Sequence, residues 1–270
     1  MQSVAIPQNW ERAVSYGDGF FETVLVVDGK APLWAFHRAR LIDAAKRLRM
    51  DCDIATIENS FQQCAKQQSL AVVKIIVARS GGQRGYSPAN TNYSVSIKAY
   101  PAPQFSQQRI TQGLRLHLCR QRVAHNPALA GIKHLSRLEQ VLTTGELNKS
   151  LYDDGLMLDT QGSVIEGISS NVFVLQKNTL LTPNLKSCGV AGVMRAFVLQ
   201  QLAADIGMAV EETRLTLQDC LNAEGMFLCN SVIGIVPVQS IGVSKIALHT
   251  ETVTKIWQKL SMLGYARLYG

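Results

Sequence analysis

The chain is organised around the stretch Gly131-Ile132-Lys133-His134-Leu135-Ser136-Arg137-Leu138-Glu139-Gln140-Val141. Its apolar spacing predicts an amphipathic helix over residues 133–147, directly after the loop 126–131. Lys133 would stand at the start of that helix. A lysine amine that points into a pocket loses its proton readily and can form a Schiff base with an aldehyde. A solvated lysine at a helix start is the simpler interpretation, so other residues must decide between the two.

Length and composition describe an ordinary globular protein. The chain has 270 residues, of which 47% are hydrophobic and 17% charged, enough for one large or two modest domains. The net charge is +7, but the basic residues are scattered and are not interleaved with aromatic residues as in a nucleic-acid-binding surface. We therefore expect no nucleic-acid partner. A pocket for anionic small molecules explains the basic excess equally well.

The cysteines and the apolar segments indicate a cytoplasmic protein without a membrane anchor. Six cysteines, at positions 52, 64, 119, 188, 220 and 229, show no C-x-x-C pair and no zinc-finger spacing, so we expect reduced thiols and no metal site. The first ten residues lack the basic and apolar pattern of a signal peptide. Residues 225–244 carry no charge, but Asn230, Gly234 and Pro237 interrupt them, which predicts buried strands and turns and not a membrane span.

The chain is predicted to fold into two α+β domains. Residues 1–100 form a small α+β domain, 101–110 a polar, proline-bearing interdomain linker, and 111–270 a larger mixed α/β domain that carries Lys133. In the small domain the predicted strands are 20–27, 31–34, 71–78 and 93–100, and the predicted helices are 36–50 and 55–68. In the larger domain the predicted helices are 133–147, 193–206 and 250–262, and the predicted strands are 114–119, 155–158, 164–167, 172–175, 180–182, 209–214, 225–229 and 233–238.

Glu166 is the first residue that favours a cofactor site. It stands in the apolar run Val164-Ile165-Glu166-Gly167-Ile168, where an unpaired carboxylate would be costly. A pyridoxal phosphate site needs a lysine for the aldehyde, a group facing the pyridine nitrogen and a cradle for the phosphate. A carboxylate at the ring nitrogen would keep the ring protonated. The alternative is a strand glutamate that faces water or an arginine.

Two further segments and one arginine fit the phosphate requirement. The glycines of residues 189–195 stand just before a predicted helix, whose first N–H groups attract an anion. Asn230-Ser231 follows a predicted strand and offers a hydroxyl and a backbone N–H. Arg40 can grip a phosphate through paired hydrogen bonds, or it is simply a solvated helix residue. We interpret the nearby His37 as a packed or helix-start histidine and not as a catalyst.

Taken in order, these segments closely resemble the fold-type IV pyridoxal-phosphate enzymes, which include branched-chain and D-amino-acid aminotransferases and aminodeoxychorismate lyases. The resemblance spans nearly the whole chain. Its motifs are Gly-Asp-Gly-Phe-Phe-Glu-Thr at 17–23, His-Arg-Ala-Arg-Leu at 37–41, Lys133, Glu-Gly-Ile-Ser-Ser-Asn at 166–171, residues 189–195 and Cys-Asn-Ser at 229–231. It implies a two-domain fold like that of the D-amino-acid aminotransferases, and a homodimer whose pocket lies between the domains and near the partner subunit.

The resemblance also implies roles for individual residues. The lysine that holds the cofactor aldehyde and acts as the catalytic base corresponds to Lys133, and the carboxylate at the pyridine nitrogen corresponds to Glu166. It assigns no individual role to Asp18 or Glu22. The other candidates contact the phosphate, the phenolic oxygen or the substrate: Arg40, Val193, Met194, Asn230 and Ser231 for the phosphate, Arg137 for the phenolic oxygen, and Arg84, Tyr86 and Thr23 for the substrate.

Within the family, residues 126–141 and the glycine-rich loop 80–86 resemble the lyase branch. Branched-chain aminotransferases place a tyrosine five residues after the lysine, at the phenolic oxygen, whereas this chain has Leu138, so Arg137 or a water would serve. The resemblance implies conversion of 4-amino-4-deoxychorismate to 4-aminobenzoate and pyruvate in folate biosynthesis, with pyridoxal phosphate as cofactor. A fold-type IV aminotransferase for D- or branched-chain amino acids is the alternative.

Overall fold

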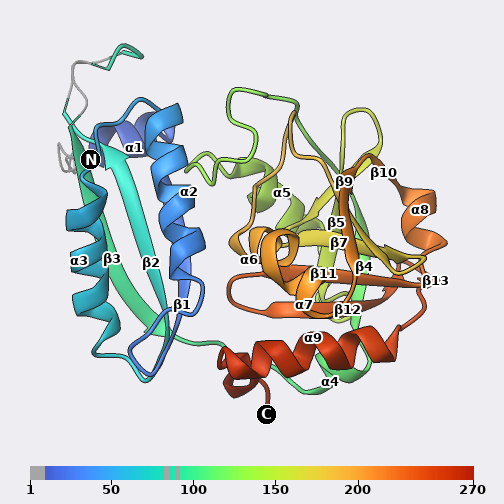
Figure 1. Cartoon of the computed structure of the whole chain (residues 1–270). Coiled ribbons are helices and arrows are strands. Elements are labelled where there is room, and N and C mark those ends of the chain that lie inside the picture. The colour runs from blue at the N-terminus through green and yellow to red at the C-terminus, as the bar shows by residue number, and fades with distance from the viewer. Residues whose placement is uncertain (1–9, 82–84, 89–91) are drawn as a thin grey trace. The chain divides into compact units, whose positions relative to one another are not determined.

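The computed structural model describes residues 10–81, 85–88 and 92–270, which fall into two compact units (Figure 1). The first unit contains the chain up to Ala102 together with residues 132–137, and the second contains residues 103–131 and 138–270. The chain thus leaves the first unit inside the segment 101–110, where we predicted a linker. In that segment Pro101 ends a strand, and the short helix α4 spans Gln108–Thr111.

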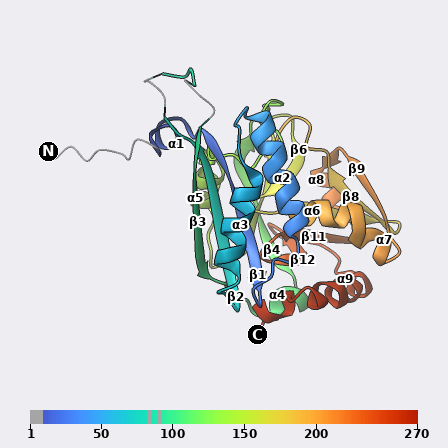
Figure 2. The same ribbon diagram turned by 60° about the vertical axis from the view of Figure 1, so that its left-hand side comes forward.

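The first unit is a three-stranded antiparallel sheet with two helices side by side on one face (Figures 1 and 2). The predicted strands 20–27, 71–78 and 93–100 are confirmed. Alternate side chains of these β-branched strands pack against the helices and exclude water. The elements are α1 (Glu11–Tyr16), β1 (Gly19–Val27), α2 (Trp34–Arg47), α3 (Ile54–Ala65), β2 (Leu70–Arg79) and β3 (Tyr93–Pro101). The core between the sheet and the helices includes Val24, Val26, Leu41, Ile57, Phe61, Val73, Ile75 and Val77.

The predicted strand at residues 31–34 is wrong. Asp28 and Gly29 make the expected tight turn, with φ values of 49° and 74°, but beyond it only Lys30 pairs back, with Val27. Pro32 follows, and α2 begins two residues later. Because proline has no N–H for a sheet and its fixed φ suits the start of a helix, the chain turns into α2 instead of extending the hairpin.

The second unit is built on a ten-stranded mixed sheet in the order β10-β6-β5-β4-β12-β11-β7-β8-β9, with β13 paired to β12. The pairs β4–β5, β4–β12 and β8–β9 are parallel. Central strands such as β6, β7 and β11 are buried almost throughout, which explains their continuous apolar sequences. The strands are β4 (Leu114–Val123), β5 (Asp154–Asp159), β6 (Ser163–Gly167), β7 (Asn171–Gln176), β8 (Thr179–Pro183), β9 (Ala209–Thr213), β10 (Leu215–Thr216), β11 (Gly225–Asn230), β12 (Gly234–Ile241) and β13 (Ser244–Lys245).

Helix α5 (Leu138–Glu146) is shorter than the predicted helix 133–147, because residues 132–137 are not helical and residues 133–135 pair with β1 instead. The predicted helix 193–206 is confirmed as a continuous helical segment that contains a π-helical stretch. The other helices of this unit are α6 (Val193–Phe197), the π-helical η2 (Val198–Leu202), α7 (Ala203–Asp205), α8 (Leu217–Leu221), α9 (Thr250–Met262) and the 3-10 helix η3 (Tyr265–Leu268).

All six cysteines are free thiols, and four of them are buried. Among the residues that the structure describes, no helix has both the length and the apolar character needed to cross a lipid bilayer.

Candidate active site

Lys133 is positioned by backbone pairing with strand β1. The Phe21 N–H donates to the Lys133 carbonyl and the Leu135 N–H donates to the Gly19 carbonyl, each at 3.0 Å. The Lys133 ammonium lies 4.2 Å from the centre of the Phe21 ring, a favourable cation–π distance. Residues 132–137 therefore group with the first unit, whereas the sequence analysis placed Lys133 in the larger domain at a helix start. The lysine lies five residues before α5, on an extended segment whose conformation the sheet imposes.

Glu22 lies at the centre of a buried cluster on the helix-facing side of β1. It accepts hydrogen bonds from Arg40 Nε at 2.7 Å and from Arg40 Nη2 at 2.6 Å. Its Oε2 also lies 2.6 Å from His37 Nδ1. Burial opposes ionisation, but the nearby Arg40 and His37 outweigh it and lower the pKa of Glu22 to about 2. Burial lowers the pKa of His37 more than Glu22 raises it. His37 is packed, as we interpreted it, and Arg40 is held by a carboxylate.

Sequence reasoning missed this cluster. The signal was available, because Glu22 is the only acid within the strand 19–27, and His37 and Arg40 are three residues apart on one helix face. That the strand and the helix face each other at this point could not be predicted from local sequence patterns.

Arg137 and His134 form a second pair on the same extended segment. Arg137 Nη2 donates to His134 Nε2. Burial, and then the positive charge of Arg137, lower the pKa of His134 to about 4. His134 is therefore neutral at physiological pH, which leaves Nε2 able to accept the bond. The pair fixes the guanidinium of Arg137, the residue that we predicted to contact the phenolic oxygen.

In the second unit, Glu166 is the buried strand carboxylate that the sequence predicted. It lies on β6 with 4% of its surface exposed. The Val190 N–H donates to its Oε2 at 2.8 Å, and Gln140 Nε2 donates to its Oε1 at 3.3 Å. Both bonds favour the ionised carboxylate. Gln140, on α5, was not predicted, because nothing in its local sequence indicates a partner on β6.

The glycine-rich loop 189–192 is shaped by contacts that leave no room for side chains. A Cβ on Gly189 would lie 2.8 Å from Ile165 Cγ2, and a Cβ on Gly192 would overlap Oδ1 of Asn171. Asn171 in turn donates from Nδ2 to the Val190 carbonyl at 2.8 Å. The loop thus brings the backbone up to Glu166 and ends at Val193, where α6 begins.

The start of α6 has the chemistry of an anion cradle. The N–H groups of a first helical turn have no partner within the helix and carry the positive end of its dipole. Val193 and Met194 occupy this turn. Because their side chains are buried, they would contact an anion through their backbone N–H groups. An anion such as a phosphate group fits these donors.

Ser231 and Asn230 follow strand β11. Asn230 Oδ1 accepts from the N–H groups of Val232 and Ile233, both at 2.8 Å, and its Nδ2 donates to the Ser169 carbonyl at 3.1 Å. The side chain of Asn230, predicted to contact phosphate, thus shapes the turn that carries Ser231.

Two of the three predicted substrate residues, Tyr86 and Thr23, lie in the described part of the first unit. Arg84 is outside the described residues. Tyr86 is 86% exposed and its ring centre lies 5.3 Å from that of Tyr16. Thr23 is half-buried on β1. Arg12 donates to the carbonyls of Gly85 at 2.9 Å and Tyr86 at 3.1 Å, which ties this loop to α1.

Asp18, for which the sequence offered no role, holds two arginines at the start of β1. Arg12 Nε donates to its Oδ2 at 2.8 Å and Arg79 Nε at 3.0 Å. Arg79 also donates to the carbonyls of Leu48 and Arg49. Asp18 therefore joins α1, β2 and the end of α2 into one charged network.

These residues fit pyridoxal phosphate in their chemistry. A lysine amine, a buried carboxylate and a glycine-led helix start supply the three kinds of group that the cofactor needs. The chain also matches the amino-transferase class IV family over residues 19–241. It belongs to this family of fold-type IV enzymes, which depend on pyridoxal phosphate.

Within that family the chain is similar to proteins of two activities. It is 34% identical over 235 residues to an aminodeoxychorismate lyase from Vibrio harveyi, with 86% of each chain covered. A crystal structure of 4-amino-4-deoxychorismate lyase from Pseudomonas aeruginosa superposes with a TM-score of 0.90 at 36% identity, over 97% of this chain and 96% of that one. A putative branched-chain-amino-acid aminotransferase from Methanocaldococcus jannaschii is 29% identical over 238 residues, with 86% of this chain and 81% of the relative covered.

Proposed function

We propose that this chain is an aminodeoxychorismate lyase that converts 4-amino-4-deoxychorismate to 4-aminobenzoate and pyruvate, a step of folate biosynthesis. The similarity over almost the full length to the Pseudomonas lyase, at 36% identity, is the observation that carries the proposal. Leu138 supports it, because the family's branched-chain aminotransferases have a tyrosine at this position. Leu138 is 74% exposed at the first position of α5 and offers no hydroxyl.

Lys133 and Glu166 hold the reactive ends of the cofactor in this proposal. Pyridoxal phosphate, when bound, supplies an electron-accepting ring that stabilises negative charge on the carbon next to the substrate nitrogen. Lys133 would hold the aldehyde of the cofactor. Glu166, ionised and bonded to the Val190 N–H, keeps a proton at the ring nitrogen. The backbone at Val193 and Met194 receives the phosphate.

The remaining polar candidates bind the anionic groups. Ser231 and Arg40 complete the phosphate contacts. Glu22 positions the guanidinium of Arg40, because it accepts hydrogen bonds from Nε and Nη2. Arg137, fixed by His134, serves the phenolic oxygen. The substrate has two carboxylates, and we assign one of them to Arg84 and Tyr86, with Thr23 nearby.

Lys133 moves the proton in the proposed reaction. Its free amine removes the proton from the ring carbon that bears the substrate nitrogen. The bond between the neighbouring ring carbon and the ether oxygen then breaks, and the ring becomes aromatic. The enolpyruvyl group leaves and takes up one proton to become pyruvate, so the proton lost by the ring is balanced.

The test replaces Lys133 and a control lysine. Lys74 also approaches the Phe21 ring, at 5.1 Å, which makes Lys74→Ala a matched control. Lys133→Ala should lose both the visible absorbance of lysine-bound cofactor and the release of fluorescent 4-aminobenzoate, and Lys74→Ala should keep both. Full turnover by Lys133→Ala would reject the assignment of this lysine.

A fold-type IV aminotransferase is the second candidate, and the Methanocaldococcus relative favours it. An aminotransferase needs a keto acid, whereas the lyase does not. Glutamate formation from 2-oxoglutarate and a branched-chain or D-amino acid, without 4-aminobenzoate formation from aminodeoxychorismate, would establish the aminotransferase instead.

The proposal also includes the oligomeric state and the location: the protein is a homodimer and lies in the cytoplasm. Leu138, Val141 and Leu142 are 74%, 63% and 62% exposed on one face of α5, an apolar surface that a second copy would cover. The six free thiols suit a reducing compartment. Light scattering should give twice the chain mass of 29.6 kDa. Leu142→Glu should weaken the dimer, whereas Val243→Glu, at a position 99% exposed, should not. A monomeric wild-type protein would contradict this part.

A further inference from the structure

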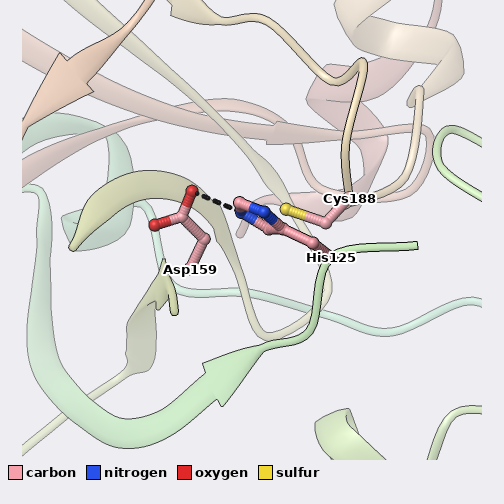
Figure 3. A group of neighbouring side chains, drawn as sticks. All are labelled: His125, Asp159 and Cys188. Carbon is pink, nitrogen blue, oxygen red and sulfur yellow. Dashed lines mark hydrogen bonds and ion pairs between the residues drawn. The ribbon is translucent and has the colours of Figure 1, made fainter. Parts of the chain in front are cut away.

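Three potential metal ligands, none of them assigned to the cofactor, converge in the second unit (Figure 3). His125 follows β4, Asp159 ends β5, and Cys188 lies in the loop between β8 and α6. One ligand atom from each lies within 4.8 Å of the other two. His125 Nε2 and Asp159 Oδ2 are 2.9 Å apart. Asp159 and Cys188 are buried, and His125 is the most exposed of the three.

The surrounding backbone fixes these ligands before any ion binds. Asp159 Oδ1 accepts from the N–H groups of Gln161 at 2.9 Å and Ser163 at 2.8 Å. Its Oδ2 is therefore left directed at His125. The Asn126 N–H donates to the Ser187 carbonyl at 2.8 Å, which joins the segments that carry His125 and Cys188. Such outer contacts orient metal ligands and raise affinity.

The cluster opens on one side into a cavity of about 170 Å³. Space of this size admits an ion with a water or a small anion. Arg214 lines the cavity, and its Nε donates to Ser163 Oγ at 2.9 Å, so it adds a positive charge suited to an anionic ligand. The other polar residues of the lining are Gln161, Asn184, Ser187 and Thr213.

We propose that His125, Asp159 and Cys188 bind one Zn²⁺ ion, with a water or an anion from the cavity as fourth ligand. An imidazole nitrogen, a carboxylate oxygen and a thiolate are all ligands that zinc accepts, and three protein ligands with one open position are a common zinc arrangement. Tetrahedral zinc places its ligand atoms about 3.5 Å apart. A pair at the 4.8 Å limit would therefore close by about 1.3 Å, whereas His125 Nε2 and Asp159 Oδ2, now 2.9 Å apart, would separate by about 0.6 Å. The Cys188 thiol releases its proton to solvent as the bond forms. Magnesium and calcium prefer all-oxygen sites.

No metal site was predicted from the sequence, because the cysteines show no C-x-x-C pair and no zinc-finger spacing. Here the ligands are 34 and 29 residues apart in sequence (159 − 125 and 188 − 159), and only the sheet brings them together. A bound ion would brace the loop that follows Cys188. In that loop the Gly189 carbonyl accepts from the Gly131 N–H, and the Val190 N–H donates to Glu166. The ion would therefore stabilise the backbone beside the carboxylate.

The experiment measures zinc binding by the untagged full-length holoprotein after chelator treatment and dialysis. Zn²⁺ is titrated in competition with a chromophoric chelator, and Co²⁺ is added separately for its visible tetrahedral bands. We expect one ion per chain, and a loss of affinity of about 100-fold or more in Cys188→Ser and in His125→Gln. Cys52→Ser, which changes a half-buried thiol in the first unit, is the control and should bind as the wild type does.

Circular dichroism and cofactor absorbance show whether each variant is folded, so a loss of binding is not confused with unfolding. Zinc binding that is equal in the wild type and Cys188→Ser would overturn the proposal, as would the absence of stoichiometric binding by the wild type. Equal binding of Mg²⁺ would also contradict it. The result is independent of whether the chain is a lyase or an aminotransferase, because neither reaction is measured.

Discussion

Replacing Glu22 by Gln tests the account of the first unit most directly. The carboxylate is almost fully buried and receives three close contacts, two from Arg40 and one from His37. Glutamine keeps the size of the side chain and removes its charge. Arg40, with 11% of its side chain exposed, would then be a nearly buried cation without its carboxylate.

The expected cost follows from the pKa of Glu22. Its value falls from 4.5 to about 2 in the folded protein. At about 1.4 kcal/mol per pKa unit, this difference corresponds to about 3 kcal/mol of stability at neutral pH. Removing one partner of a buried ion pair costs a similar amount, about 3–5 kcal/mol. Because the folded pKa is the lower one, the contribution is complete above about pH 4.5 and is lost as the pH falls towards 2.

Urea unfolding at pH 7, followed by circular dichroism, measures this cost. Asp43→Asn is the control, because Asp43 pairs with Arg47 at 3.4 Å on the same helix and 56% of its side chain is exposed. We expect the control to lose at most about 1 kcal/mol. If Glu22→Gln were no less stable than the control, the buried cluster would not stabilise the fold as argued here.

Three further predictions concern the site and the pH dependence. Glu166→Ala should lower the turnover number by about 100-fold or more while cofactor absorbance falls much less, and wild-type turnover with cofactor bound would refute its role at the ring nitrogen. Gly192→Ala should cost about 1–3 kcal/mol in urea unfolding because its Cβ has no space, whereas Gly145→Ala, which meets nothing within 4 Å, should be neutral or stabilising. Stability of the wild type should decrease below about pH 6.5, since the folded pKa of His37 lies below that value. It should decrease again below about pH 4.5, where Glu22 begins to take up a proton in the unfolded chain. A urea midpoint that stays the same from pH 7 to pH 4 would contradict this.

Local sequence patterns predicted the helices and strands whose conformation depends mainly on residues near them in the chain. Most strands of both units were located because their β-branched and apolar runs are bounded by turn residues, whereas the two-residue strands β10 and β13 were not predicted. The helix predicted to begin at Lys133 was wrong at its start, because the apolar spacing of α5 continues backwards into residues that β1 draws into an extended pairing. The hydrogen-bond partner lies more than one hundred residues away in sequence, and no periodicity within the helix reveals it.

In the candidate site, too, the sequence predicts some features and not others. Burial of Glu166 was one of two interpretations that the sequence allowed, and the structure has the carboxylate buried and bonded instead of facing water. The partners could not be predicted: Gln140 reaches Glu166 from α5, and Glu22 meets His37 and Arg40 only because α2 packs on β1. Side-chain partners across elements depend on register and packing, which the chain acquires only when the sheet forms.

The pairing of residues 133–135 with β1 has a consequence for insertions and deletions. Successive side chains of an extended segment point to opposite faces, so a slip of one residue would turn the Lys133 amine away and present Ile132 or His134 in its place. The upstream loop residues 126–129 can therefore change their composition but not their number. Engineering of this loop would succeed with substitutions and fail with single-residue indels, although the loop itself carries no catalytic group.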